Sequence, residues 1–376
     1  MPPAPRTTPP TIAVDLRALV PTPTGIGVYT RSLLLELAAR GGMRYRGLAH
    51  RPARGAEELA AAGIESEHEP APLGVIWQQL KLPRRLERGD IDLFWSPLMT
   101  IPLRCPVPAV ATVHDLTSIL MPESHRFKVK WSIFPFLRPS LERVERIVAI
   151  SRATADDIAF HFPQVARKIR VIYSGIDPEF RPGTPDEIQA TREEIGARDG
   201  YLLYAGTIEP RKNIGAVLDA WEALRLEDPS VPPLVLVGPY GWGSRELVRR
   251  IEALAPLGVK TFGHVDRDRL VRLFQAAAVF VYPSFYEGFG LPPAEALACG
   301  IPTVVSNVSS LPEVVGDAGL KVDPADPGEL MMAIRNLLES PARREELRGK
   351  GLERAAMFRW ERTAAEMEEV FSEALG

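Results

Sequence analysis

The stretch VFVYPSFYEGFGLPPAEALACGIPTVV, residues 279–305, holds two short apolar runs separated by a glycine- and proline-rich loop and a short helical segment. VFVYPS and IPTVV are typical of buried strands, because each is a short apolar run bounded by turn residues. Pro292 and Pro293 suit the opening turn of a helix, where a missing N–H costs little, and Gly300 is placed to end that helix. The segment therefore predicts strand, loop, helix and strand in succession, as in a parallel sheet covered by helices.

Two carboxylates, Glu287 and Glu295, stand in the loop and in the first turns of the predicted helix. A helix N-terminus offers unpaired N–H groups and a partial positive charge, which suit a phosphate, and Gly288 and Gly290 let a ligand approach the backbone. Carboxylates would repel a phosphate, but they would accept hydrogen bonds from sugar hydroxyls. The alternative is that Glu295 only complements the helix dipole and that Glu287 is a solvated loop residue.

The rest of the chain repeats the alternation of apolar strands with amphipathic helices. The other strand candidates are TIAVDLRAL, IDLFWSP, PAVATVHDL, RIVAISR, KIRVIYSGID, YLLYAGT, PLVLVGPYG and VKTFGHV. Proline and glycine cluster in GIDPEFRPGTPDE, near residue 180, and this cluster predicts the seam between two domains. The predicted fold class is α/β, with two Rossmann-like domains and a ligand cleft between them, at the carboxyl ends of the strands.

Length and composition limit the classes of function. A chain of 376 residues suggests two domains, and the net charge of −3 gives no general attraction for nucleic acid. The two cysteines, Cys105 and Cys299, are far apart in sequence and are expected as buried thiols in a reducing compartment. The N-terminal MPPAPRTTPPT lacks the apolar core of a signal peptide, and no apolar run is long enough to cross a bilayer. We therefore expect a cytoplasmic protein.

Two further loops have the composition of anion-binding sites. PTPTGIGVYTRSL places Gly25 and Gly27 between a strand and a helix start, although a tight turn without a ligand explains this loop equally well. YAGTIEPRKNIGAVLDA places Arg211 and Lys212 between a strand end and the next helix, where two cations would neutralise a diphosphate. The alternative for this pair is solvated surface charge. Neither loop carries the full glycine fingerprint of a dinucleotide-binding domain.

A histidine, His114, directly follows the apolar strand of PAVATVHDL. At the end of a strand it would hydrogen-bond a substrate hydroxyl or exchange a proton, or else it is a hydrogen-bonded structural residue. No spacing of His, Cys and Asp suggests a metal site.

Together these loops resemble those of the retaining glycosyltransferases of family 4, which have the GT-B fold of two facing Rossmann-like domains. The resemblance covers nearly all of residues 11–376 and is most specific in GTIEPRKN, EGFGLPPAEALACGIPTV and SSLPEVVGDAGL. TGIGVYT, VHDL, VAISRAT, VIYSGID and FRWERTA are also similar. The expected divisions are a disordered Pro-rich tail at 1–10, an acceptor-binding domain at 11–178, a nucleotide-sugar-binding domain at 179–357, and a helix at 358–376 that crosses back to the first domain.

The resemblance implies catalytic roles for four residues. Glu287 would hold the hydroxyls of the donor sugar, and His114 would contact the sugar near the reaction centre. Lys212 and Arg211 would bind the diphosphate and stabilise charge on the leaving group. Among the donor-binding positions, Glu295 would accept hydrogen bonds from the ribose, and Val265 would border the base. The full set of implied donor-binding residues is Gly25, Gly27, Thr207, Val265, Gly288, Phe289, Gly290, Leu291 and Glu295.

One position departs from the family pattern. Many members have an arginine directly after the glycine that ends this strand, whereas this chain has Thr207, so Arg211 would take over that role. GT-B enzymes generally act without a bound metal, so no cofactor is expected. Retention of configuration would follow from attack by the acceptor on the same face of the sugar, with the leaving phosphate as base.

The predicted function is transfer of a hexosyl unit from a nucleoside-diphosphate sugar to a glycan or lipid-linked acceptor of a cell-surface polysaccharide. The GTIEPRKN loop is similar to those of mannosyl- and rhamnosyltransferases, which favours GDP-mannose as donor. Two alternatives are a non-catalytic protein that binds sugar nucleotides and an oxidoreductase, which the incomplete glycine fingerprint disfavours.

Two basic amphipathic stretches predict contact with an anionic membrane at the inner face of the cell membrane. They are HRFKVKWSIFPFLRPSLERVER, residues 125–146 with Phe127, Trp131, Phe134 and Phe136, and VIWQQLKLPRRLER, residues 75–88. The alternative is that the apolar residues pack into the first domain and the charges are solvated.

Overall fold

The computed structural model describes residues 8–20, 24–121 and 127–376, with the side chains of 127–133 excepted. The chain forms two compact units, which are described separately below. One unit runs from the N-terminus to Gly175 and includes Arg359–Gly376 at the C-terminus, and the other comprises Ile176–Phe358. No helix in the described ranges is both long and apolar enough to cross a membrane.

The first unit is built on a parallel sheet that has seven strands within the described residues, in the order β3-β2-β1-β4-β5-β6-β7. The central strands β1, β4 and β5 are buried along their whole length, because helices cover both faces of a parallel sheet. The strands are β1 (Thr11–Asp15), β2 (Arg44–Ala49), β3 (Glu65–His68), β4 (Leu93–Ser96), β5 (Ala109–Val113), β6 (Arg146–Ala149) and β7 (Ile169–Val171).

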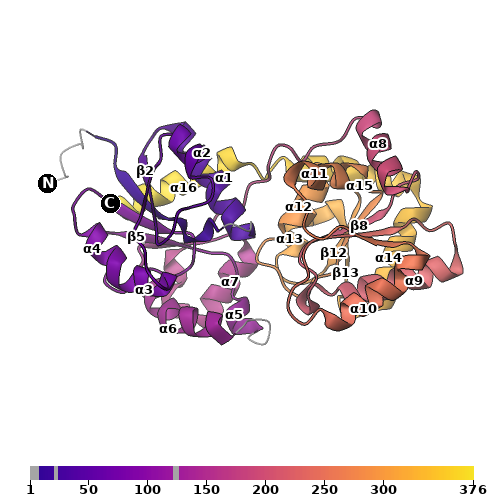
Figure 1. The fold of residues 1–376 in the computed structure, drawn as a ribbon, viewed down its shortest axis with the longest axis horizontal. Helices are drawn as coiled ribbons and strands as arrows, with labels where there is room; N and C mark the ends of the chain where they lie inside the picture. Colours follow the sequence, from indigo (N-terminus) through magenta and orange to yellow (C-terminus); the bar gives the residue numbers. More distant parts are fainter. Residues whose placement is uncertain (1–7, 21–23, 122–126) are drawn as a thin grey trace. The chain divides into compact units, whose positions relative to one another are not determined.

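The helices of this unit include one that arrives from the far end of the chain. Helix α16 (Trp360–Leu375) packs against α1, and the ring of Phe371 lies 5.7 Å from that of Trp95. In Figure 1 this yellow helix lies among the indigo and purple elements of the first unit. The other helices are α1 (Gly25–Arg40), α2 (Ala56–Ala61), α3 (Gly74–Ile76), α4 (Leu82–Leu86), α5 (Thr117–Leu120), α6 (Phe127–Arg143) and α7 (Arg152–His161).

The second unit repeats the design with a six-stranded parallel sheet, in the order β10-β9-β8-β11-β12-β13. Its strands are β8 (Leu202–Ala205), β9 (Leu234–Val237), β10 (Val259–Thr261), β11 (Val279–Tyr282), β12 (Thr303–Ser306) and β13 (Gly319–Val322). Its helices are α8 (Pro185–Ile195), α9 (Ile214–Glu227), α10 (Arg245–Leu254), α11 (Arg267–Ala276), α12 (Leu291–Ala298), α13 (Leu311–Val315), α14 (Pro327–Glu339) and α15 (Pro341–Ala355).

The strand order of the second sheet reverses between β8 and β11. Strands β9 and β10 are added on one side of β8, and β11, β12 and β13 follow on the other side. In open α/β sheets the loops on either side of such a reversal diverge and leave room for a ligand at the carboxyl edge. The loops that follow β8 and β11 carry the two most specific motifs of the sequence, so the topology brings these motifs together.

Candidate functional site

The loop after β8 turns sharply before α9 and presents two cations. Pro210–Lys212 form one turn of 3-10 helix, which ends at Asn213 in the left-handed region with φ of 57°. The Arg211 guanidinium donates to Glu209 at 2.8 Å and to the carbonyl of Tyr286 at 2.6 Å. The side chain of Arg211 is thus held across the gap between the loops that follow β8 and β11.

The loop after β11 places Glu287 against these cations. Lys212 Nζ donates a hydrogen bond to Glu287 Oε1, and an Arg211 nitrogen lies 3.5 Å from the same oxygen. Ser284 Oγ also donates to Oε1, at 2.7 Å. Lys212 and Glu287 are each only 8% exposed. Neither residue is therefore a solvated surface charge, which was the alternative interpretation for both.

Burial and charge act in opposite directions on this ion pair. Burial would raise the pKa of Glu287, but the charges of Lys212 and Arg211 outweigh it and hold the pKa below its usual value. Burial lowers the pKa of Lys212, and the charge of Glu287 opposes that shift. A buried charge is tolerated only when it is paired and hydrogen-bonded, so each partner keeps the other ionised.

Four supporting residues received no role from the sequence, although all lie within or beside the motifs quoted above. Tyr282 Oη accepts a hydrogen bond from Lys212, and Ser284 bonds Glu287 as described. Ser309 Oγ accepts from the Glu287 amide at 3.0 Å, and Ser310 Oγ lies 2.9 Å from the Glu287 carbonyl. Ser309 also has a left-handed backbone with φ of 53°, and such strain often marks functional sites. In the sequence, the only indication that Ser309 has a role was its place in the SSLPEVV motif.

Helix α12 begins where the sequence predicted: Leu291 is its first residue, and Pro292 and Pro293 are the second and third. The prolines remove two N–H groups from the first turn, so the backbone N–H groups at this helix start belong to Gly288–Leu291. Gly290 caps the helix with φ of 98°, which favours glycine.

Glu295 lies in the second turn of α12 and is partly buried. Burial raises its pKa to about 7; Arg267 opposes the shift and Asp177 adds to it. Among the residues that the structure describes, no group donates a hydrogen bond to this carboxylate. It therefore retains its capacity to accept hydrogen bonds from a ligand.

The other predicted donor-binding residues of this unit follow the carboxyl ends of β8, β10 and β11. The carbonyl of Thr207 accepts from Tyr204 at 3.1 Å, and the Phe289 ring is buried against Phe358 at 5.3 Å. Val265 lies between β10 and α11 and is partly exposed. These positions share one edge of the sheet with Lys212 and Glu287.

Gly25, Gly27 and His114 belong to the other unit. Thr24 caps α1 by accepting from the Gly27 amide at 3.1 Å, and a Cβ at Gly27 would lie 2.9 Å from the Ala18 carbonyl oxygen, whereas Gly25 faces open space. The buried His114 bonds Pro97 O through Nε2 at 3.0 Å, and burial lowers its pKa to about 4. The imidazole is thus neutral near pH 7 and held by the backbone, with Nε2 as the protonated nitrogen.

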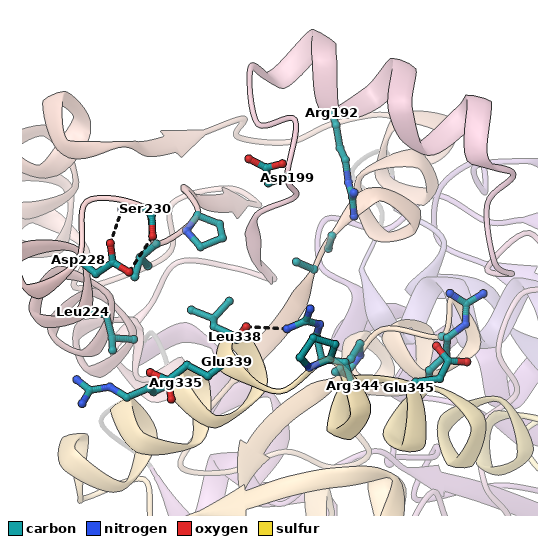
Figure 2. Close-up of a pocket in the computed structure, with 18 of the residues that line it drawn as sticks. Arg192, Asp199, Leu224, Asp228, Ser230, Arg335, Leu338, Glu339, Arg344 and Glu345 are labelled. Atoms are coloured by element: carbon teal, nitrogen blue, oxygen red, sulfur yellow. Dashed lines mark hydrogen bonds between the residues drawn. The ribbon is translucent and has the colours of Figure 1, made fainter.

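A cavity of about 790 Å³ in the second unit lies away from these residues. Its lining precedes β8, β9, β11 and β12, at the amino edge of the sheet, and Figure 2 shows Arg335, Glu339, Arg344 and Glu345 from α14 and α15 along one side. Arg344 donates to the Leu338 carbonyl, and Arg335 pairs with Glu227. This cavity contains none of the predicted site residues. Within the described residues, no group of three or more His, Cys, Asp or Glu side chains is placed to hold a metal ion.

Comparison with known proteins agrees with the predicted family. The profile described as "Glycosyltransferase Family 4" matches residues 23–180, and that described as "Glycosyl transferases group 1" matches residues 186–354. The O-antigen chain mannosyltransferase B of Escherichia coli is 34% identical over 357 residues, which cover 90% of this chain and 93% of that protein. The serotype-specific mannosyltransferase WbdA of E. coli is 30% identical over 69% of this chain but only 32% of its own length.

Solved structures confirm the predicted fold class. HepE from Anabaena, crystallised with UDP and glucose, superposes with a TM-score of 0.75 at 20% identity and covers 97% of this chain and all of its own. WaaG, a glycosyltransferase involved in lipopolysaccharide biosynthesis, gives 0.73 at 17% identity, over 96% of this chain and 99% of its own. The chain therefore belongs to the glycosyltransferases of family 4 and has their two-domain GT-B fold.

Proposed function

We propose that this glycosyltransferase moves a mannosyl unit from GDP-mannose to a glycan or lipid-linked acceptor in the assembly of a cell-surface polysaccharide, with retention of configuration. The buried pair of Lys212 and Glu287 is the observation that carries the proposal, because it combines a cation for a diphosphate with a carboxylate for sugar hydroxyls. The choice of mannose and of a surface polysaccharide is supported by the name of the E. coli relative, an O-antigen chain mannosyltransferase.

The chemistry separates charge at the sugar–phosphate bond. The anomeric carbon–oxygen bond breaks, the electron pair goes to the diphosphate oxygen, and positive character develops on the anomeric carbon. Lys212 and Arg211 stabilise the negative charge on the diphosphate, as fixed cations in a site with little water do most effectively. The acceptor hydroxyl then bonds to the anomeric carbon from the same face, and its proton passes to the leaving phosphate.

Recognition of the donor is divided between two carboxylates. Glu287 is ionised and would accept hydrogen bonds from hydroxyls of the transferred sugar, while remaining paired with Lys212. Glu295 lies one turn into α12 and would accept from the ribose, because it has no protein donor within the described chain. Hydroxyl donors favour the ionised carboxylate, so nucleotide binding would lower the pKa of Glu295 from about 7.

The reaction is proposed to need no bound metal, because Lys212 and Arg211 supply the positive charge at the diphosphate. Removal of divalent ions with EDTA should therefore leave turnover unchanged. Loss of turnover that Mg²⁺ restores would contradict this part of the proposal.

The experiment is a transfer assay with a panel of nucleotide sugars that includes GDP-mannose, UDP-glucose and dTDP-rhamnose. Mannobiose and a lipid-linked glycan serve as acceptors, and release of nucleoside diphosphate is measured. NMR of the anomeric proton and carbon of the product tests retention. Binding of GDP-mannose without release of GDP under any acceptor condition would favour the non-catalytic alternative instead.

Peripheral attachment at the cytoplasmic face of the membrane belongs to the same proposal. Leu80 is 63% exposed and Arg84 is exposed beside it, whereas Arg85 is neutralised by Glu67 and Asp90, at 2.7 and 2.8 Å. In α6, Phe134 is 41% exposed, and the side chains of Phe127 and Trp131 lie outside the described residues. The exposed surface is thus less basic than residues 75–88 suggest.

Co-sedimentation with vesicles tests this attachment. We expect binding to anionic vesicles at low salt and release at high salt, with weaker binding in Arg84→Glu. Equal binding to neutral and anionic vesicles, or none at low salt, would indicate a soluble acceptor.

A further inference from the structure

Tyr282 makes a contact that the proposed function does not use. It is the last residue of β11 and only 1% exposed, and its hydroxyl oxygen accepts a hydrogen bond from Lys212 Nζ at 2.7 Å. The strand that carries Tyr282 pairs with β8, and the loop after β8 carries Lys212. The contact therefore links the two strands on either side of the reversal in strand order.

The ring of Tyr282 has a fixed position in the sheet. It stacks on Tyr204 of β8, with centroids 5.5 Å apart and planes 15° apart, and on Phe280 at 5.9 Å. A Cβ at Gly206 would lie 3.1 Å from the Tyr204 hydroxyl and 3.4 Å from the Tyr282 ring. Tyr204 of the neighbouring strand β8 and Phe280 of β11 itself thus pack against the ring and fix the position of its hydroxyl.

The geometry leaves one direction open for the Lys212 ammonium. An ammonium has three N–H donors, and Tyr282 and Glu287 accept two of them. Burial and the charge of Glu287 raise the pKa of Tyr282 well above its usual value, so the phenol is an uncharged acceptor. It orients the ammonium without neutralising it, and within the described part of the chain no other acceptor bonds the third N–H, which is left for a ligand.

We propose that Tyr282 is a positioning residue, whose hydroxyl holds the Lys212 ammonium so that its remaining N–H points to the diphosphate of the sugar nucleotide. This inference rests on the proposed function, because it assumes that Lys212 binds the diphosphate. The competing explanation is that Tyr282 only fills the core through its ring.

Replacing Tyr282 with phenylalanine separates the two explanations, because it keeps the ring and removes the acceptor. The charged groups around the ammonium are Glu287 after β11 and Arg211 and Glu209 after β8, and all three residues are kept in the variant, although the phenol's hydrogen bond with Glu287 is lost together with its bond to Lys212. Without the phenol oxygen the ammonium form of Lys212 loses a hydrogen bond, so Lys212 should lose its proton at lower pH. As pH rises, the variant should therefore lose its affinity for a diphosphate at a lower pH than the wild type does.

The experiment measures GDP affinity by calorimetry from pH 6.5 to pH 10 in the full-length wild type, Tyr282→Phe and Tyr204→Phe. Tyr204→Phe is the matched control, since its hydroxyl belongs to the same stack but bonds the Thr207 carbonyl instead of Lys212. The rise in Tm caused by GDP is recorded at pH 7 and pH 9 on the same samples, so that binding is reported even in a destabilised variant.

In Tyr282→Phe we expect GDP affinity to fall severalfold at pH 7. The alkaline limb of the profile, where affinity is lost as pH rises, should move by about one pH unit toward acid, because a hydrogen bond to a charged group is lost. In Tyr204→Phe the limb should stay in place. Superimposable profiles for Tyr282→Phe and wild type, or equal shifts in both variants, would overturn the inference. Wild-type protein that binds GDP but transfers no sugar would instead refute the proposed function, and the binding profiles would still decide the role of Tyr282.

Discussion

Lys212 and Glu287, 75 positions apart in sequence, form a buried ion pair across the reversal in strand order of the second sheet. The lysine ends the turn after β8, and the glutamate lies in the loop after β11. Arg211, Ser284 and Tyr282 each bond one member of the pair or lie beside it. Binding of a diphosphate would place a second anion at the same ammonium. The pair is therefore both a structural link and the centre of the proposed donor site.

Replacement of Glu287 by glutamine should reduce transfer by about two or more orders of magnitude, because a charged hydrogen bond to the reacting sugar is lost. GDP affinity at pH 7 should fall much less than transfer, since the carboxylate is proposed to contact the sugar, but affinity should be lost at a lower pH than in the wild type, because the charge of Glu287 helps to keep Lys212 protonated. Steady-state kinetics and calorimetry on the same protein test both statements. Transfer within a few-fold of wild type would remove Glu287 from the donor sugar.

Glu287→Ala should behave differently from Glu287→Gln. Alanine removes both the charge and the acceptor oxygen that glutamine keeps beside the Lys212 ammonium, and breaking a buried pair in this way costs roughly 3–5 kcal/mol. We therefore expect a clear loss of stability in chemical denaturation, in addition to the loss of transfer. Equal stability of the alanine variant and wild type would show that water reaches the ammonium.

Lys212→Met should weaken GDP binding by about tenfold or more and also slow transfer, because the charge acts on the diphosphate in both the ground and the transition state. Lys350→Met is the control, since it removes an exposed lysine that pairs with Glu346 on α15. Calorimetry with GDP measures the effect. If both variants bind GDP like wild type, Lys212 lies outside the nucleotide site.

The sequence predicted the fold and the two residues of the ion pair, but it did not predict which other side chains hold that pair in place. Apolar runs bounded by turn residues gave β11 and β12, and the two prolines gave the start of α12, because both signals are local. The rule that ligands bind at the carboxyl edge brought Lys212 and Glu287 to one edge. The hydroxyls of Tyr282 and Ser310 carried no such signal: one ends an apolar strand and the other lies in a loop, and only the tertiary contacts give them a role.

Ser310→Ala tests whether the loop that carries Glu287 must be held rigidly. The buried Ser310 hydroxyl lies within hydrogen-bonding distance of the carbonyls of Glu287 and Phe289, at 2.9 and 2.8 Å, and its single proton serves both. Loss of this buried donor should cost about 1–3 kcal/mol of stability. It should also raise the KM for GDP-mannose, because the loop amides lose their fixed position.

A matched control for Ser310→Ala is Ser372→Ala in α16. That hydroxyl also donates to a backbone carbonyl, Glu368 O at 2.8 Å, but it is exposed and lies in the other unit. We expect this control to leave the KM for GDP-mannose unchanged. A Ser310→Ala protein with wild-type KM and kcat would show that the serine serves stability alone.

His114→Gln should impair transfer while leaving GDP affinity unchanged, because His114 belongs to the unit that does not contain Lys212. With a pKa of about 4, the imidazole stays neutral from pH 5.5 to pH 8, so it should produce no limb in the pH–rate profile over that range. Its folded-state pKa lies below the ordinary value of 6.5, so its contribution to stability is present above pH 6.5 and is lost as pH falls toward 4. Normal transfer by His114→Gln would favour the purely structural role.

Glu295 gives the sharpest pH prediction. Its pKa rises from 4.5 to about 7 in the folded protein, so between these values the folded state binds more protons than the unfolded state. Stability must then fall as pH rises through this window, and Glu295→Gln should remove that loss. Denaturation of both proteins at pH 5 and pH 8 measures it, and the variant should gain clearly more on wild type at pH 8 than at pH 5. If the two proteins differ in stability by the same amount at both pH values, the Glu295 carboxyl is exposed to water and burial does not raise its pKa.

Nucleotide binding should reverse this titration, because ribose hydroxyls donate to the carboxylate form. Near pH 7 the wild type should release a fraction of a proton on binding GDP, seen as a binding enthalpy that depends on the ionisation enthalpy of the buffer. Glu295→Gln should bind GDP more weakly and show no such dependence, whereas Glu353→Gln, which removes an exposed carboxylate of α15, should behave like wild type. A buffer dependence that persists in Glu295→Gln would assign the proton to another group. Weaker binding without any proton release in wild type would mean that Glu295 is already ionised in the free protein and that burial does not control it.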